Sequence, residues 1–362
     1  MKFQFFAPML TLLLFSVASL AQAPTEPLFP KVFPQPTGKN GLEEIIMAGD
    51  LLASSQALKD FELLPNKPNL VEKRTIVSNA MVSRAIKLYR SGLRKRLEMP
   101  KADELSKFAG HGYLRRIAWL LTEDSYVLLA DGKTSLAIDD MEGVLELSRI
   151  VQSDRLMGGL SGALMDAYTL RSIVQHMDQM SEPDSKRLMS ISKEWLSAPD
   201  SSAKAFAMGR EDFMGELEPL LESIPKADAE QAREWANNRV AQIAEHIKKP
   251  FSERQPLPPR EPIGVGPELV AALDSLNALE RSFLTFAKDR ARVQELGVHA
   301  AIHKWKWDHD QLPESLTQLS LGNMIIDPFT DQRMIYKKKS ENTYELIVEG
   351  LIRKPVLDDP TI

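Results

Sequence analysis

The sequence predicts a mainly α-helical protein, built from antiparallel helical hairpins and ending in a small β-hairpin. Three observations support this fold class. Apolar residues recur with the period of a helix face through most of the chain, and proline, glycine and capping residues separate these segments at short intervals. Strand-like alternation is confined to residues 333–350. A solenoid-like stack remains open, although no fixed-period repeat is visible.

The N-terminus has the features of an export signal. Lys2 precedes an apolar run that ends at Val17, and a small residue follows at Ala21. We expect cleavage after Ala21, which makes residues 1–21 a signal peptide and the protein periplasmic or secreted. An uncleaved anchor is the alternative, which Pro8 and the short apolar run disfavour. The chain contains no Cys, so it is no lipid-anchored lipoprotein and forms no disulfides.

Residues 22–40 carry five prolines in a polar context, which predicts an extended spacer. Helical periodicity begins at Gly41 and defines a helical body over 41–248. Short turns between its helices favour antiparallel neighbours. The predicted helices cover residues 42–64, 69–98, 101–131, 134–152, 155–180, 184–197, 201–224 and 227–248. The small residues of "MGGLSGALMDA" predict a close approach of a neighbouring helix, since a phosphate loop would need a Lys and a Ser or Thr beside its glycines.

Charge argues against one class of partner. The formal net charge of the chain is −5, so an exported protein of this kind is a poor candidate for nucleic-acid binding. One basic stretch gathers its side chains on one face of a predicted helix. These are Arg84, Lys87, Arg90 and Arg94. We favour a solvated helix face there, with an anionic ligand site as the alternative.

A second proline-rich stretch, residues 249–265, is either a linker or a loop packed on the body. Pro267 then begins a long helix, and residues 266–362 hold this helix and a small C-terminal module. The apolar stripe of the helix predicts that Trp305 is a packing residue, through which the module, residues 300–352, docks on the body. The stripe consists of Leu284, Ala287, Ala291, Val298, Ala301, Ile302 and Trp305.

The C-terminal segments "WKWDHDQLPESLTQL", "DPFTDQRMIY" and "YELIVEG" resemble the end of type II secretion major pseudopilins, G type. They are also similar to a broad group of poorly characterised exported bacterial proteins, in which an all-helical body ends in such a tail. The matching residues are Trp305, Asp308, His309, Pro313, Glu314, Ser315, Leu316, Asp327, Pro328, Phe329, Thr330, Tyr336 and Gly350. The resemblance implies a structural module rather than an activity. A pilin is not expected, because pseudopilins retain an apolar N-terminal helix.

Two aspartates stand where this tail usually has glycine. Asp310 and Asp331 are therefore expected in left-handed turns, which Asp tolerates better than most residues. Asp308 and His309 are interpreted as groups that terminate the long helix, since a His can bond the free carbonyls of the last turn.

One metal site is conceivable. His299 and His303 are four residues apart on the long helix, and Asp310 falls on the same side, so the three could hold a divalent ion. We favour the alternative of an exposed polar flank, because the trio lies about 100° from the apolar stripe. No cofactor is expected.

Two hypotheses of function remain. The first is an exported helical binding or scaffold protein of the bacterial envelope, whose partner is a protein or another envelope macromolecule. No nucleic acid is expected as a partner, and no stable membrane span after signal cleavage. The second is an envelope enzyme of hydrolase type, with acids distant in sequence around Glu211 and Glu216. Two Ser-x-x-Lys spacings, at Ser190 and Ser201, are attributed to chance, and the sequence contains no G-x-S-x-G, H-E-x-x-H or Walker motif.

Overall fold

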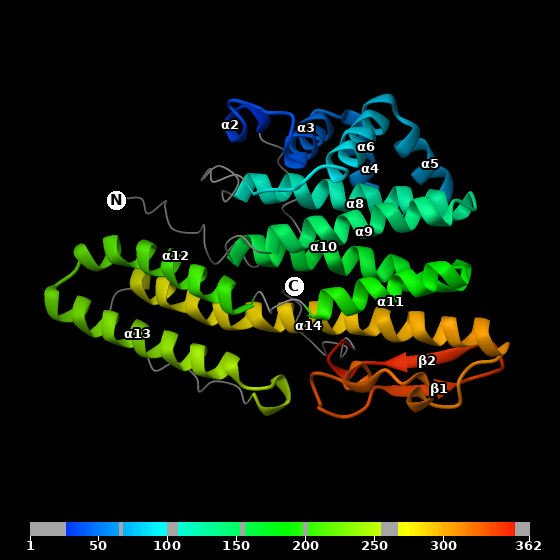
Figure 1. Ribbon diagram of the computed structural model, residues 1–362. Coiled ribbons are helices and arrows are strands. Elements are labelled where there is room, and N and C mark those ends of the chain that lie inside the picture. Colours follow the sequence, from blue (N-terminus) through cyan, green and yellow to red (C-terminus); the bar gives the residue numbers. More distant parts are fainter. Residues whose placement is uncertain are drawn as a thin grey trace.

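The protein is mainly α-helical with one two-stranded antiparallel sheet near its C-terminus, as predicted (Figure 1). The computed structural model describes residues 27–64, 68–99, 108–152, 156–197, 202–254 and 267–351. The predicted signal peptide, residues 1–21, lies outside these ranges. The α-helices are α2 (Phe29–Val32), α3 (Gly41–Ala53), α4 (Gln56–Glu62), α5 (Leu70–Ser78), α6 (Ala80–Leu93), α8 (Phe108–Ala130), α9 (Thr134–Gln152), α10 (Leu156–Gln175), α11 (Glu182–Ser197), α12 (Ser202–Glu222), α13 (Lys226–Lys248) and α14 (Pro267–His309). The strands are β1 (Ile335–Lys338) and β2 (Tyr344–Ile347).

Side-chain caps explain where the N-terminal helices begin and why two predicted helices are each divided. Residues 42–64 form α3 and α4, because the Ser55 side chain accepts the backbone N–H of Leu58 and starts a new helix. Residues 69–98 form α5 and α6, since Asn79 caps α6 in the same way. Asn69 starts α5 with a capping box. The other predicted helices end within a few residues of the observed ones.

The helices stack in layers that follow the chain (Figure 1). Helices α3 to α6 form the first layer, and α8, α9 and α10 lie beneath it. Helix α11 and the C-terminal half of α14 close the stack on its other side. We call these layers the body. Its hydrophobic interior consists of one cluster under α3 to α6 and a second among α8 to α11 and α14.

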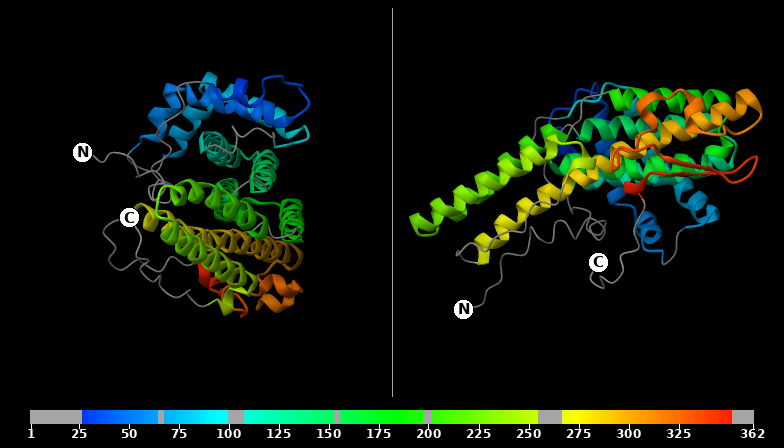
Figure 2. Two further views of the ribbon diagram at one scale, coloured as in Figure 1. Left: turned by 90° about the vertical axis from the view of Figure 1, so that its left-hand side faces the viewer. Right: turned by 90° about the horizontal axis from the view of Figure 1, so that it is seen from below.

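An arm projects from the body (Figure 2). It consists of α12, α13 and the N-terminal half of α14, residues 267–286, and it has its own apolar core. Leu217, Ala236 and Phe283 represent the three helices in this core. Helix α14 continues from the arm into the body and so belongs to both parts. No helix in the described ranges is long and apolar enough to cross a membrane.

Small residues bring helices into close contact. A Cβ on Gly162 of α10 would collide with the Ser148 carbonyl and the Gln152 side chain of α9. The close approach predicted for the "MGGLSGALMDA" segment is therefore confirmed. Gly41 and Gly92 play the same role between α3 and α6.

The segment before α3 packs more tightly than the expected spacer. Of the predicted spacer, residues 27–40 are described, and Leu28 and Val32 are buried against the first layer. The carboxylate of Asp50 accepts the backbone N–H groups of Leu28 and Phe29, both at 2.8 Å. An aspartate that receives N–H groups at the start of a helix satisfies donors that the helix leaves free. Residues 28–33 are therefore packed on the body, whereas residues 34–39 are exposed.

The C-terminal module docks on α14, but not through Trp305. Its apolar face covers Val298 and Ile302, and the Gln294 amide donates to backbone carbonyls of the module, including that of Met324 at 2.8 Å. Trp305 is half-buried and stacks on His309 outside this cluster. Leu284, also predicted in the stripe, is exposed. The prediction of docking through Trp305 is wrong, because the module approaches α14 one turn or more before Trp305.

The second proline-rich segment is packed where it is described. The ring of Phe251 meets that of Phe329 edge-on, with centroids 4.7 Å apart. Arg254 donates to the carbonyls of Ile247 and Lys249. This favours a packed loop over a linker for residues 249–254, whereas residues 255–265 lie outside the described ranges.

Candidate functional site

The structure brings together two of the three predicted metal ligands. His299 and His303 lie on one side of α14 beneath the β-hairpin, whereas Asp310 is exposed beyond the end of the helix. Contrary to the expectation of an exposed flank, His303 is buried, because the hairpin and the turn after α10 cover this side of α14. Within the described residues, no group of three His, Cys, Asp or Glu side chains is placed to hold a metal ion.

The histidines are instead partners of a tyrosine that sequence reasoning missed. Tyr344 of β2 places its hydroxyl 2.6 Å from Nδ1 of His299, and its ring meets that of His303 edge-on. Burial, with a smaller contribution from the neighbouring His303, lowers the pKa of His299 to about 4. His299 is therefore a neutral imidazole at physiological pH. Alternation along β2 alone could not identify which residue of α14 Tyr344 meets.

Two acids border the histidines. Asp178, in the turn after α10, places Oδ1 3.5 Å from Nε2 of His303. Burial lowers the pKa of His303, and the Asp178 carboxylate opposes that shift. Burial raises the pKa of Glu295 to about 7, which Arg292 counteracts in part. This seam is a partly buried polar contact between helix and hairpin, with Asp178 at its exposed edge, and it helps to hold the module in place.

The residues that carry the pseudopilin resemblance have structural roles. Asp327 is buried, and its carboxylate accepts the N–H groups of Phe329 at 2.8 Å and of Glu349 at 2.6 Å. Gly350 leaves no room for a Cβ, because the Phe329 ring lies against it. The hydroxyl of Tyr336 donates to the Pro313 carbonyl at 2.8 Å. These contacts close the turns of the module.

The left-handed turns predicted at the two aspartates are confirmed. Asp310 has φ = 56° and Asp331 has φ = 57°. Nδ1 of His309 lies 3.0 Å from the Trp305 carbonyl, as expected of a helix-terminating His. Ser320 is a further left-handed residue, which the sequence did not predict.

Two aspartates distant in sequence meet in the interior. Asp166 of α10 and Asp289 of α14 are both buried, and the amide of Gln152 of α9 donates to both, at 2.8 and 2.9 Å. The enzyme hypothesis needs acids distant in sequence that also reach solvent, and this pair does not. Of the acids suggested for that hypothesis, Glu211 is exposed on α12, and the side chain of Glu216 lies outside the described residues.

The basic stretch of α6 divides into one partly buried side chain that is paired with acids and three exposed side chains. Arg90 points inward, where it donates to Asp140 at 2.8 Å and pairs with Asp124. Arg84, Lys87 and Arg94 are exposed, and none of them has a salt bridge or side-chain hydrogen bond among the described residues. By helix geometry they span about 15 Å of one side of α6.

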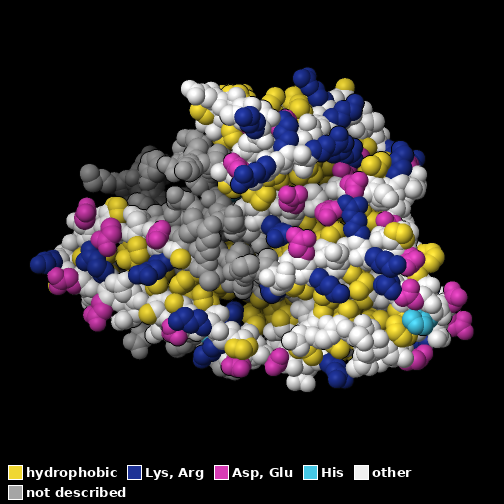
Figure 3. Space-filling view, in the orientation of Figure 1, with side chains coloured by type: hydrophobic (Ala, Val, Ile, Leu, Met, Phe, Trp, Pro, Cys, Tyr) yellow, Lys and Arg dark blue, Asp and Glu magenta, His cyan; other side chains and the backbone are white. Residues whose placement is uncertain are grey.

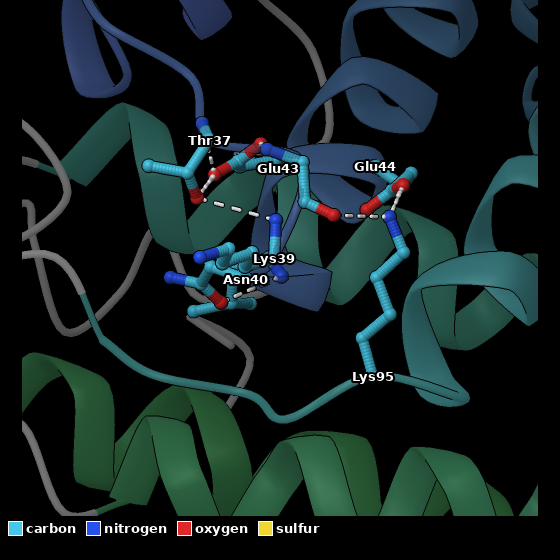
Figure 4. A network of polar contacts seen from close by, with 8 residues as sticks. Thr37, Lys39, Asn40, Glu43, Glu44 and Lys95 are labelled. Atoms are coloured by element: carbon cyan, nitrogen blue, oxygen red, sulfur yellow. Dashed lines mark hydrogen bonds and ion pairs between the residues drawn. The ribbon is translucent and has the colours of Figure 1, made fainter.

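The acids of the adjacent helix are used internally. Glu43 accepts the backbone and hydroxyl of Thr37, both at 2.9 Å, and Glu44 pairs with Lys95 (Figure 4). These hydrogen bonds lower the pKa of Glu43 against the opposing effect of desolvation, which is the largest single influence. The third acid of α3, Asp50, caps α2. Consequently α3 offers no free carboxylate to the three cations of α6.

Two partly exposed methionines belong to the same layer as these cations. Met47 and Ser54 occupy the same side of α3, two turns apart, and the Ser54 hydroxyl contacts the sulfur of Met81 on α6 at 3.8 Å. Both methionines are partly exposed. We call this surface, with Arg84, Lys87, Arg94, Met47 and Met81, the cationic face. In Figure 3, Lys and Arg side chains gather over the α3 to α6 layer at the top of the view.

The charge of the whole first layer agrees with this surface. Residues 27–99 contain twelve Lys and Arg and seven Asp and Glu, a surplus of five positive charges in a chain whose net charge is −5. The cationic charge is therefore concentrated in one layer of the molecule, which the net charge of the chain conceals.

Comparisons with known proteins return no match. No family model matches the chain, and neither a curated protein nor a solved structure matches it. The pseudopilin resemblance of the C-terminal module accordingly stays a prediction.

Proposed function

We propose that the protein is a binding or scaffold protein of the bacterial envelope, which holds an anionic macromolecule on the cationic face. The observation that carries the proposal is the pattern of pairing on α3 and α6. Cations of this layer that point inward or sideways are matched by acids, as Arg90 is by Asp124 and Asp140. Arg84, Lys87 and Arg94 have no such partner among the described residues.

Electrostatics supports an anionic partner for this surface. Three unpaired cations within about 15 Å produce a positive potential that attracts a polyanion and accelerates its association. Because α3 and α6 form an outer layer, the cations can reach a partner without any rearrangement of the body. Met47 and Met81 add flexible apolar contact area at the same place. Export through a cleaved signal, expected from residues 1–21, would bring this surface to the envelope.

The resemblance of the tail is consistent with a scaffold role. Buried apolar contacts hold the C-terminal module on α14. Asp327 and Gly350 stabilise turns within the module itself. It therefore contributes shape and stability to the protein, and the partner surface lies on the opposite side of the body (Figure 1).

Binding of a defined polyanion tests the proposal. Heparin serves as the probe, and the affinity of the unaltered protein is compared with that of the triple variant Arg84→Gln, Lys87→Gln, Arg94→Gln. The matched control is Arg171→Gln, Lys193→Gln, Lys249→Gln, which removes three exposed cations elsewhere on the molecule. We expect the first triple variant to bind heparin at least about tenfold more weakly at low ionic strength, because it loses three charge–charge contacts with the polyanion. A tenfold loss corresponds to about 1.4 kcal/mol of binding free energy.

The control should bind nearly as the unaltered protein does. Equal losses in the two triple variants would attribute binding to net charge alone and would refute a specific cationic face. Undetectable binding of heparin by the unaltered protein at low ionic strength would count against the proposal as well.

A further inference from the structure

The strongest feature outside the cationic face is the pair of buried carboxyl groups on α10 and α14. Nε2 of Gln152 donates to Oδ2 of Asp166 and Oδ2 of Asp289, at 2.8 and 2.9 Å, and it also lies 3.2 Å from the Ser148 hydroxyl. The Oδ1 atoms of both aspartates are buried and accept no hydrogen bond from a described donor. The two carboxyl groups also interact directly with each other.

This arrangement is unfavourable for two negative charges. Like charges in contact within an apolar interior cannot both persist without a compensating cation. In the described part of the chain, neither Asp166 nor Asp289 forms a salt bridge with a Lys or Arg. Arg292 of α14 acts on Asp289 at longer range, and α9 contributes the uncharged Ser148 and Gln152. No charged group of α8, α11 or α12 forms a described salt bridge or hydrogen bond with the pair.

The pair lies where the arm joins the body. On α10, Asp166 stands between Ala163, which belongs to the core of the arm, and Leu170, which belongs to the core of the body. On α14, Asp289 stands between Phe286 of the arm core and Val293 of the body core. Polar contact among α9, α10 and α14 is therefore placed at the boundary between two apolar clusters.

We propose that Asp166 and Asp289 keep at least one proton between them up to neutral pH and form a pH-sensitive joint between the arm and the body. When the pair holds one proton, the protonated carboxyl group donates a hydrogen bond to the other aspartate, and the Gln152 amide donates hydrogen bonds that stabilise the remaining negative charge. Loss of that proton leaves two adjacent carboxylates, whose repulsion and need for water separate α10 from α14. The arm then loosens without unfolding, because its own core remains intact. The joint is independent of the anionic partner proposed above.

The direction of the pH effect follows from burial. Desolvation raises the pKa of Asp289 to about 7 and raises the pKa of Asp166 well above its ordinary value. The unfolded-state pKa of Asp is about 3.9. The shared proton therefore stabilises the joint fully below about pH 4, and this stability is lost as the pH rises through the folded pKa values of the pair.

Distance measurements across the joint test this inference. The chain has no Cys, so Lys226→Cys at the tip of the arm and Lys193→Cys on α11 provide two unique sites for spin labels. Double electron–electron resonance should give a narrow distance distribution at pH 5 and a broader one at pH 9. The same labels in Asp289→Asn should give a narrow distribution at both values, because an Asn amide donates where the protonated carboxyl did.

Two further variants make the result decisive. Asp166→Asn replaces the partner acid and should also remove the broadening at pH 9. If one of the two Asn variants folds poorly, the other still tests the proposal. Glu295→Gln removes another buried acid of α14 and should leave the broadening unchanged. An unaltered protein with the same distribution at both pH values would overturn the proposal. So would broadening in both Asn variants equal to that of the unaltered protein, or its loss in Glu295→Gln alone.

Discussion

His299 of the long helix and Tyr344 of the second strand are joined by a hydrogen bond of 2.6 Å between Nδ1 and Oη. The bond crosses the contact between α14 and the hairpin, and both side chains are half-buried. Burial raises the pKa of Tyr344 well above its ordinary value, so its hydroxyl stays protonated and can donate to the neutral imidazole. This pair ties a two-stranded hairpin, which alone is at best marginally stable, to the body.

Tyr344→Phe should therefore lower the free energy of unfolding by about 1–3 kcal/mol, since it leaves a buried imidazole nitrogen without its partner. Urea denaturation followed by circular dichroism measures the change. Limited proteolysis should show faster cleavage between residues 320 and 350 while the helical body stays intact. An unchanged midpoint would indicate that water or another group replaces the hydroxyl.

The same pair predicts sensitivity to acid. The folded pKa of His299, about 4, is below the unfolded value of about 6.5, so folding favours the neutral ring. Its contribution to stability is complete above pH 6.5 and is lost as the pH falls toward 4, by up to about 3 kcal/mol. His299→Gln should flatten this part of a stability-versus-pH curve, whereas the exposed-site control His309→Gln should not. A curve for His299→Gln as steep as that of the unaltered protein would rule out this assignment.

The contact that docks the module can be located by two alanine substitutions. Ile302 is fully buried in the cluster shared by α14 and the module, so Ile302→Ala should cost about 2–5 kcal/mol. Trp305→Ala should cost less and leave the module resistant to protease, because the indole stacks on His309 outside that cluster. Thermal denaturation and proteolysis of both variants decide the matter. A larger loss of stability in Trp305→Ala than in Ile302→Ala would instead support docking through Trp305, as the sequence predicted.

The two left-handed aspartates give a prediction with an internal control. Asp310→Gly and Asp331→Gly should be neutral or stabilising by up to about 1 kcal/mol, because glycine adopts positive φ without a steric cost. Asp310→Ala and Asp331→Ala should destabilise by about 1–2 kcal/mol, since alanine lacks the local polar contacts that help Asp there. Melting temperatures of the four variants provide the comparison. Lower values for both Gly variants would reveal contacts of the carboxylates beyond the backbone turn.

The positions of the helices were predictable because the signals are local. Proline, glycine and capping residues stand beside nearly every observed boundary. Asp310 and Asp331 were predicted in left-handed turns because they stand where the pseudopilin-like pattern usually has glycine. The divisions at Ser55 and Asn79 were not predicted. A single polar residue within an apolar helical pattern does not indicate a helix boundary by itself, and only the structure shows that these side chains cap the next helix.

The surroundings of polar residues could not be predicted in this way. Periodicity gave the side of α14 that carries His299 and His303, but it could not show that Tyr344 covers them. Asp166 and Asp289 are 123 positions apart, and nothing in either segment indicates the other. The basic residues of α6 were visible, whereas the pairing of Arg90 and of the α3 acids, which leaves three cations free, depends on tertiary contacts.

Lysine footprinting is the most direct measurement of the central claim that the cationic face binds an anionic macromolecule. An amine-reactive reagent labels exposed lysines, and mass spectrometry compares the labelling rates with and without saturating heparin. We predict that labelling of Lys87 slows markedly on binding, while Lys193 and Lys249, exposed elsewhere, react at unchanged rates. Labelling of Lys87 at the same rate with and without bound heparin would contradict the account.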